Sequence, residues 1–179
     1  MKLWKKILIV LLCLIVLPFI IAIFIPRSYT VSVSETINQP RQVVYDYVRI
    51  LNNQKNYSIW VMEDKDLNPE IVGTDGTLGA IQKWNSKLEN VGEGEQEITA
   101  LTIDRMDVDL RFKRPFEGNA KAGYTFKAVN ETQTVITAEF YSNTPYPFNL
   151  PSYIFGKKMI TEAQTTNLQN LKRILEQAK

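Results

Sequence analysis

The sequence contains 179 residues, which is enough for one domain and an appendage. It has no histidine, and its one cysteine, Cys13, lies in an apolar N-terminal segment. Internal disulfides, structural zinc sites, Cys–His nucleophiles and any histidine general base are therefore excluded. The net charge is +2, but four of the 21 basic residues lie before residue 28, where there is no acid, which leaves 17 basic residues against 19 acidic ones. A mildly acidic domain lacks the basic surface that nucleic-acid binding requires, so we expect no nucleic-acid partner.

Residues 7–25 form a run of 19 uncharged, mostly apolar residues. A spanning helix needs about 20 residues, whereas a cleavable signal has an apolar core of roughly 7–15 residues and then a small-x-small site. This run ends instead in Ile25 and Pro26. The pattern favours an uncleaved single-pass anchor over a cleaved signal sequence, and favours either over a core helix.

Three lysines, the first of them Lys2, precede the run, and only Arg27 follows it closely. By the positive-inside rule, the N-terminus is cytoplasmic and the domain lies outside the cytoplasm. We therefore expect a cell-membrane protein in which residues 1–27 are a cytoplasmic stub and transmembrane anchor and residues 28–179 form the domain.

Beyond the anchor, the sequence predicts a strand, two helical segments, about six more strands and a long final helix. Residues 29–37 alternate as a strand does, and residues 40–51 and a short segment around Tyr57 follow with helical character. Further strand-like runs cover residues 69–74, 78–85, 91–103, 106–116, 119–129 and 133–142. Clean alternation over short connections predicts antiparallel hairpins with one solvated face.

Residues 152–178 predict one long helix. Its second half carries a wide apolar face formed by Leu168, Leu171, Ile174 and Leu175, whereas its first half has few large apolar residues. We expect the second half to seal against the sheet and the first half to roof a cavity. The simpler alternative is a closing helix with no cavity beneath it.

Several local motifs occur in a characteristic order along the chain. They are Ile37-Asn38-Gln39-Pro40, Val43-Val44-Tyr45-Asp46-Tyr47-Val48, Tyr57-Ser58-Ile59-Trp60, the segment 79–84, Pro115-Phe116-Glu117-Gly118 and Gly123-Tyr124-Thr125-Phe126. With the element order, they make residues 30–177 resemble the START-like superfamily, also called SRPBCC, which includes the polyketide cyclase/dehydrase and lipid-transport-like proteins. The resemblance implies an α+β helix-grip fold: a curved antiparallel sheet of about seven strands around the long helix, with a cavity between. That superfamily includes carriers, cyclases, hydrolases and sensors, so the fold alone does not identify the function.

Eight residues are candidates for contact with a ligand in such a cavity: Trp60, Gln82, Trp84, Gln96, Tyr124, Phe140, Phe155 and Met159. The alternative for the aromatic ones is that they only fill the core. If Trp84 and Ile98 face inward, the period of two along a strand turns Gln82 and Gln96 inward as well. Two buried glutamines need each other, water or a ligand as partners.

Acidic residues alternate on the opposite face of the same strand, at Glu93, Glu95 and Glu97. Their spacing matches no calcium loop, so we expect a solvated outer face and neither a metal nor a cofactor. We expect Asp107 and Asp109 on the same kind of surface, opposed by Arg111 and Lys113.

A proline-rich aromatic loop, residues 145–151, leads into the long helix. Either its aromatic side chains pack on the sheet edge, or they form a cavity rim or touch the bilayer.

The sequence favours a membrane-tethered module that binds a small apolar or amphipathic, lipid-like ligand. Without histidine, an enzyme would depend on Asp, Glu, Tyr or Lys, and no pair of carboxylates has an interpretable spacing. A cyclase or hydrolase of the same superfamily is one alternative. An interaction protein whose cavity is closed is the other.

Overall fold

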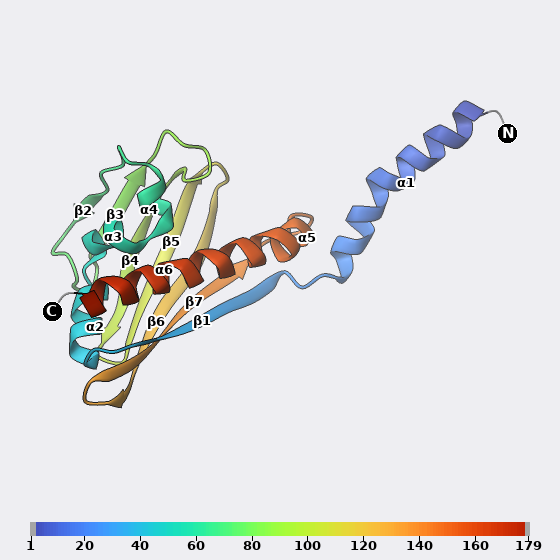
Figure 1. Ribbon diagram of the computed structural model, residues 1–179. Coiled ribbons are helices and arrows are strands. Elements are labelled where there is room, and N and C mark those ends of the chain that lie inside the picture. The colour runs from blue at the N-terminus through green and yellow to red at the C-terminus, as the bar shows by residue number, and fades with distance from the viewer. Residues whose placement is uncertain (1–2, 178–179) are drawn as a thin grey trace.

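The computed structural model describes residues 3–177, in which a sheet curves around a long C-terminal helix and an N-terminal helix projects from one end (Figure 1). The sheet is antiparallel, with seven strands in the order β1-β7-β6-β5-β4-β3-β2. The strands are β1 (Ser28–Ile37), β2 (Glu70–Val72), β3 (Ile81–Asn85), β4 (Glu93–Thr102), β5 (Arg105–Arg114), β6 (Gly118–Asn130) and β7 (Gln133–Asn143). The expected α+β helix-grip fold is confirmed.

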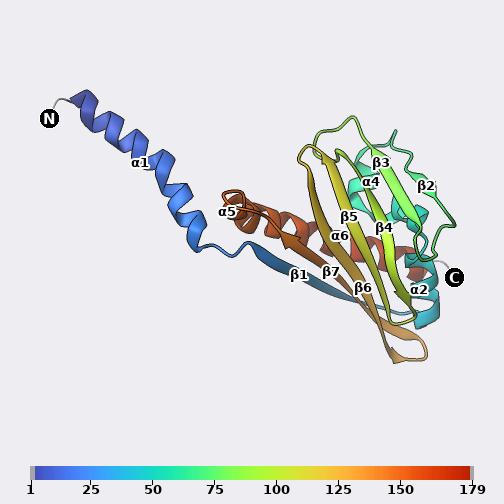
Figure 2. The same cartoon turned by 180° about the vertical axis from the view of Figure 1, so that it is seen from behind.

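The helical segments of the domain gather on the concave side of this sheet and at its ends, and the other side carries no helix (Figures 1 and 2). They are α2 (Arg41–Val48), the turn η1 (Leu51–Asn53), α3 (Gln54–Tyr57), α4 (Ile59–Glu63), α5 (Asn149–Pro151), the π-helical turn η2 (Ser152–Gly156) and α6 (Lys157–Gln177). Lys2 and Ala178, which the sequence analysis places before the apolar run and at the end of the long helix, lie outside the described residues.

The N-terminal helix α1 (Leu3–Phe24) is exposed along almost its whole length, with Ala22 as its one buried residue. It is long and apolar enough to cross a bilayer, and an N-terminal signal sequence has the same features. Three residues separate it from β1.

Side-chain alternation along the strands places the core on the concave face. Met106 and Val108 of β5 are buried there, and the register sets Val108 opposite Ala122 of β6. On the convex face, β4 and β5 carry opposite charges across the strand pair. Arg111 bonds to Glu95 at 2.6 Å and to Glu97 at 2.8 Å. The hydrogen bond from Arg111 lowers the pKa of the Glu95 carboxyl.

The expected pairing of Asp107 and Asp109 with Arg111 and Lys113 is wrong. Asp107 lies 2.7 Å from Arg105, and Asp109 lies 3.7 Å from Lys121 on the neighbouring strand. The register sets Asp109 opposite Lys121 and leaves the Arg111 side chain directed at the glutamates of β4. Alternation predicts which face a side chain occupies, but the register decides its partner.

The long helix differs from expectation at its start, where α5 and the π-helical turn η2 precede α6. Its second half packs as expected, with Leu168, Leu171 and Leu175 buried against the sheet. Polar contacts hold the same half on both sides: the Ile59 amide donates to Asn167 Oδ1 at 2.8 Å, and Gln39 Nε2 donates to the Leu175 carbonyl at 2.7 Å. Its first half is different, because Phe155 and Met159 are exposed.

Side-chain truncation to alanine should affect the stability of the domain differently in the two halves of the helix. Leu171 is 0% exposed and Met159 is 52% exposed. Leu171→Ala should lower the free energy of unfolding by about 2–5 kcal/mol, because it empties a packed position. Met159→Ala should lower it by less than about 0.5 kcal/mol. Denaturant unfolding of the full chain in detergent, followed by tryptophan fluorescence, measures both, and equal losses would contradict the division.

Candidate functional site

The sheet divides at the end from which α1 departs. Lys121 of β6 pairs with Tyr141 of β7, but the residues of β6 before Lys121 pair only with β5, and the last two residues of β7 pair only with β1. A hollow of about 810 Å³ lies at this fork. Its lining comes from four strands: Ser28, Tyr29, Thr30, Asp109, Leu110, Arg111, Asn119, Ala120, Lys121, Tyr141, Ser142 and Asn143.

The lining of the fork hollow changes in character from one face of the sheet to the other. Leu110 and Ala120 belong to the concave face, whereas Asp109, Arg111 and Lys121 belong to the convex face. A second hollow of about 360 Å³ adjoins it on the convex side and shares Asp109, Lys121 and Tyr141. The fork therefore joins an apolar surface to a charged one.

The concave face near the fork is apolar but incompletely covered. Leu110 and Phe112 of β5 and Phe140 of β7 point to the helix side, yet all three are only half-buried. The Phe112 ring packs edge-on against Trp84 of β3 at a centroid distance of 6.1 Å. α6 makes most of its sheet contacts with β1, at the far side of this surface. The first half of the helix thus leaves apolar side chains of β5 and β7 only partly covered.

The structure distributes the eight predicted ligand residues over three layers. Gln82, Trp84, Gln96, Tyr124 and Phe140 lie on the concave face of the sheet, Trp60 lies on α4, and Phe155 and Met159 lie on η2 and α6. The tryptophans, Tyr124 and Phe140 are half-buried. Contact of any of the eight with a ligand remains a prediction.

The two predicted glutamines are buried and bonded within the protein. Gln96 Nε2 donates to Gln82 Oε1 at 2.6 Å and to Gln54 Oε1 at 2.7 Å, and Gln82 Nε2 donates to the Leu51 carbonyl at 2.9 Å. The sequence analysis allowed each other, water or a ligand as partners of the two glutamines. In the structure they bond to each other, and Gln54 is a third member of the network. This network ties α3 and η1 to β3 and β4 beneath the concave face.

Sequence reasoning missed the buried polar groups of Tyr57 and Gln164. The Tyr57 hydroxyl and Gln164 Oε1 on α6 are buried with no hydrogen-bond partner among residues 3–177. Burial raises the pKa of Tyr57, and it raises that of the predicted residue Tyr124 to about 12. Gln164 could not be identified from the sequence, because period alone does not tell which polar side chain of a helix turns inward.

The loop that leads into the long helix combines exposed aromatics with one buried amide. Tyr146 and Phe148 are exposed, so they do not pack on the sheet edge. Asn149 is buried and donates from Nδ2 to the carbonyl oxygens of Ala22 at 2.7 Å and Ile25 at 2.8 Å. The loop therefore fastens the end of α1 to the domain.

The sequence matches no protein-family model and no curated protein, but its structure resembles solved ones. Truncated norcoclaurine synthase from Thalictrum flavum is 11% identical with a TM-score of 0.65, covering 85% of this chain and 96% of that one. Protein MLL2253 from Mesorhizobium loti is 12% identical with a TM-score of 0.63, covering 84% and 99%. Ara h 8.0201 is 12% identical with a TM-score of 0.58, also covering 84% and 99%. The chain has the START-like, or SRPBCC, fold, and at such identities the likeness extends to the fold alone.

Replacing the central glutamine tests whether the network supports the site. Gln96→Leu keeps the volume but leaves Gln82 Oε1 and Gln54 Oε1 without their donor, so it should lower the free energy of unfolding by about 1–3 kcal/mol. Gln133→Leu is the control, because its amide bonds to Asn38 at an exposed position. It should change stability by less than about 0.5 kcal/mol. Similar denaturant midpoints for the two variants would show that the network contributes nothing.

Proposed function

We propose that this protein is a membrane-tethered module that binds a small apolar or amphipathic, lipid-like molecule between the concave face of its sheet and the first half of α6. One observation carries the proposal: inward-facing apolar side chains of β5 and β7 are only partly buried, whereas those beneath the second half of the helix are fully buried. Leaving apolar surface uncovered costs about 25 cal/mol per Å². An apolar ligand would recover that free energy.

Polar groups at the same place suit a ligand that has a head as well as a tail. Gln164 Oε1 on α6 is buried and accepts no hydrogen bond from residues 3–177, which leaves an unused acceptor on the helix. At the fork, charged groups of Arg111 and Lys121 border the apolar Leu110 and Ala120. Both features favour an amphipathic molecule over a pure hydrocarbon.

Catalysis is the alternative, and Tyr57 and Tyr124 do not supply a general base for it. A general base must lose its proton near the working pH, whereas the raised pKa values of Tyr57 and Tyr124 keep both hydroxyls protonated at neutral pH. Binding is favoured because of the partly buried apolar side chains of β5 and β7.

A bound compound is the direct test. The domain released from its anchor should yield a co-purifying apolar compound in mass spectrometry after extraction with organic solvent. Leu110→Gln places an unpaired amide on the apolar surface and should weaken binding of a fluorescent fatty probe about tenfold or more. Val129→Gln, at an exposed position, should bind as the unaltered domain does. A domain without extractable compound and without probe binding would overturn the proposal.

The tether is the second part of the proposal, and Asn149 supports it. This buried amide bonds to two carbonyl oxygens at the end of α1, where helical carbonyls lack partners, and Ala22 is buried beside it. Removal of α1 (Leu3–Phe24) as a signal sequence would take the Ala22 carbonyl, one of its two partners, from Asn149. We infer that α1 stays attached as a single-pass anchor.

The charge pattern gives the orientation that we propose. Lys5 and Lys6 lie at the start of α1 and Arg27 just beyond its end, which favours a cytoplasmic N-terminus and a domain outside the cytoplasm. A reporter that is active only in the cytoplasm should be silent when fused after Lys179 and active when fused before Met1. A strong signal from the C-terminal fusion would reverse the orientation.

A further inference from the structure

Outside α1, the three most exposed phenylalanines are Phe116, Phe155 and Phe148, which are 82%, 71% and 64% exposed. Phe116 lies in the turn between β5 and β6, and the other two flank α5. With Ile154, which is also exposed, they are called the apolar rim here. Monomeric soluble domains rarely expose large apolar side chains together unless the surface has a partner.

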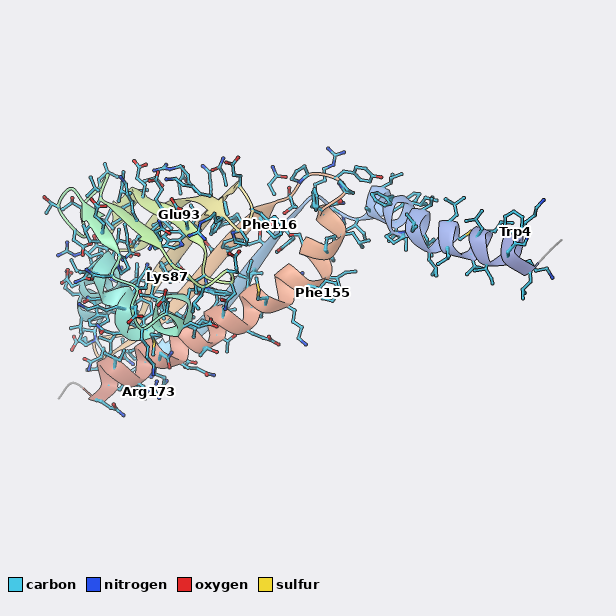
Figure 3. All side chains as sticks on the ribbon, turned by 90° about the horizontal axis from the view of Figure 1, so that it is seen from above. Trp4, Lys87, Glu93, Phe116, Phe155 and Arg173 are labelled. Atoms are coloured by element: carbon cyan, nitrogen blue, oxygen red, sulfur yellow. The ribbon has the colours of Figure 1, made fainter. Side chains whose placement is uncertain are left out.

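The apolar rim lies at the end of the domain that carries the anchor. β5 and β7 both run toward this end, and β1 starts there directly after α1. Figure 1 shows α5 beside the point from which α1 departs, and the turn between β5 and β6 at the upper edge of the domain. Figure 3 shows Phe116 and Phe155 on the side of the domain that faces α1.

The connection between anchor and rim is short and held in place. Residues 25–27 are the only ones between α1 and β1, and three residues span at most about 10 Å. Asn149, directly after Phe148, bonds to the carbonyls of Ala22 and Ile25. If α1 spans the bilayer, Phe148 and the adjoining part of the rim must lie close to the lipid headgroups, a layer roughly 5–7 Å thick on each side of the hydrocarbon core.

The surroundings of the rim suit a lipid surface more than another protein. Lys157 and Lys158 lie two and three residues after Phe155, and the Lys158 side chain is largely exposed. Arg27 and the exposed Tyr146 lie at the same end. Apolar side chains flanked by Lys, Arg and Tyr are the composition of interfacial membrane contacts.

We infer that the apolar rim inserts into the bilayer interface beside α1, and that the ligand enters the concave face from the membrane rather than from water. The inference rests on the tether and the binding function proposed above. Phe155 lies one helical turn before Met159, in the first half of the helix, and Phe116 lies in the turn that follows the strand that carries Leu110 and Phe112. A lipid tail could pass from the leaflet to this surface between the two phenylalanines.

Site-directed fluorescence on the full chain tests the insertion. Cys13 is the only cysteine, so Cys13→Ala followed by Phe155→Cys or Phe116→Cys allows one environment-sensitive NBD label per protein. Val129→Cys is the control: it is 53% exposed and lies near the turn between β6 and β7, at the opposite end of the sheet. The labelled proteins are reconstituted into phosphatidylcholine–phosphatidylglycerol vesicles with and without doxyl-labelled phosphatidylcholine.

The label at position 155 or 116 should emit to the blue of the control, and doxyl lipid should reduce its emission to roughly half, because quenching requires contact with the acyl chains. The label at position 129 should keep its emission. Labels at 155 and 116 that behave as the control does would overturn the inference. A blue-shifted emission without quenching would also overturn it, since a second copy or another protein would then cover the rim.

The result separates this inference from the function on which it rests. Unquenched labels on a protein that still carries an extractable apolar compound would refute the membrane contact and leave the binding function standing. Quenched labels on a protein that binds neither compound nor probe would support the membrane contact and refute the binding function.

Discussion

The packing of the second half of α6 against the sheet is the constraint on which the other features depend. Leu168, Leu171 and Leu175 bury that half, and polar contacts from Asn167 and to the Leu175 carbonyl hold it to α4 and to the segment after β1. A helix fixed at one end keeps its direction over its whole length, since its backbone bonds make it stiff. The first half can therefore stand over the sheet without packing tightly on it, and an apolar space can exist without loss of the fold.

The fork in the sheet follows from the same arrangement. β1 and β7 stay together along the helix, whereas β5 and β6 turn away once the pairing of β6 with β7 stops at Lys121 and Tyr141. Strands rotate against each other in any twisted sheet, and with no ladder beyond that point nothing holds the two halves together. The opening thus falls at the end of the domain where the helix packs least and where α1 departs.

The sequence predicted what depends on period and composition. Strands such as β6 and β7 were located to within one or two residues by alternation, and the apolar face of the long helix identified Leu171 as core. It did not predict what depends on register: Arg111 bonds to Glu95 and Glu97, not to the aspartates of its own strand. Gln54, Asn149 and Gln164 were also missed, because a polar residue in a helix or loop carries no sign of burial until its partners are brought near.

Asn149 gives the most specific link between the anchor and the domain. Its buried Nδ2 group satisfies carbonyls at the end of α1 that would otherwise lack a donor, while its Oδ1 accepts no bond within residues 3–177. An exposed flexible tether would need no such contact, since three connecting residues already keep the domain next to α1. Burying an amide whose oxygen has no hydrogen-bond partner costs free energy. We expect this cost to be offset where the contact fixes the angle between α1 and the domain. That angle decides whether Phe116, Phe148 and Phe155 face the bilayer or water. A domain with a closed core would not require a fixed angle to α1. A domain that exchanges a lipid-like molecule with the leaflet would require its opening to face the membrane.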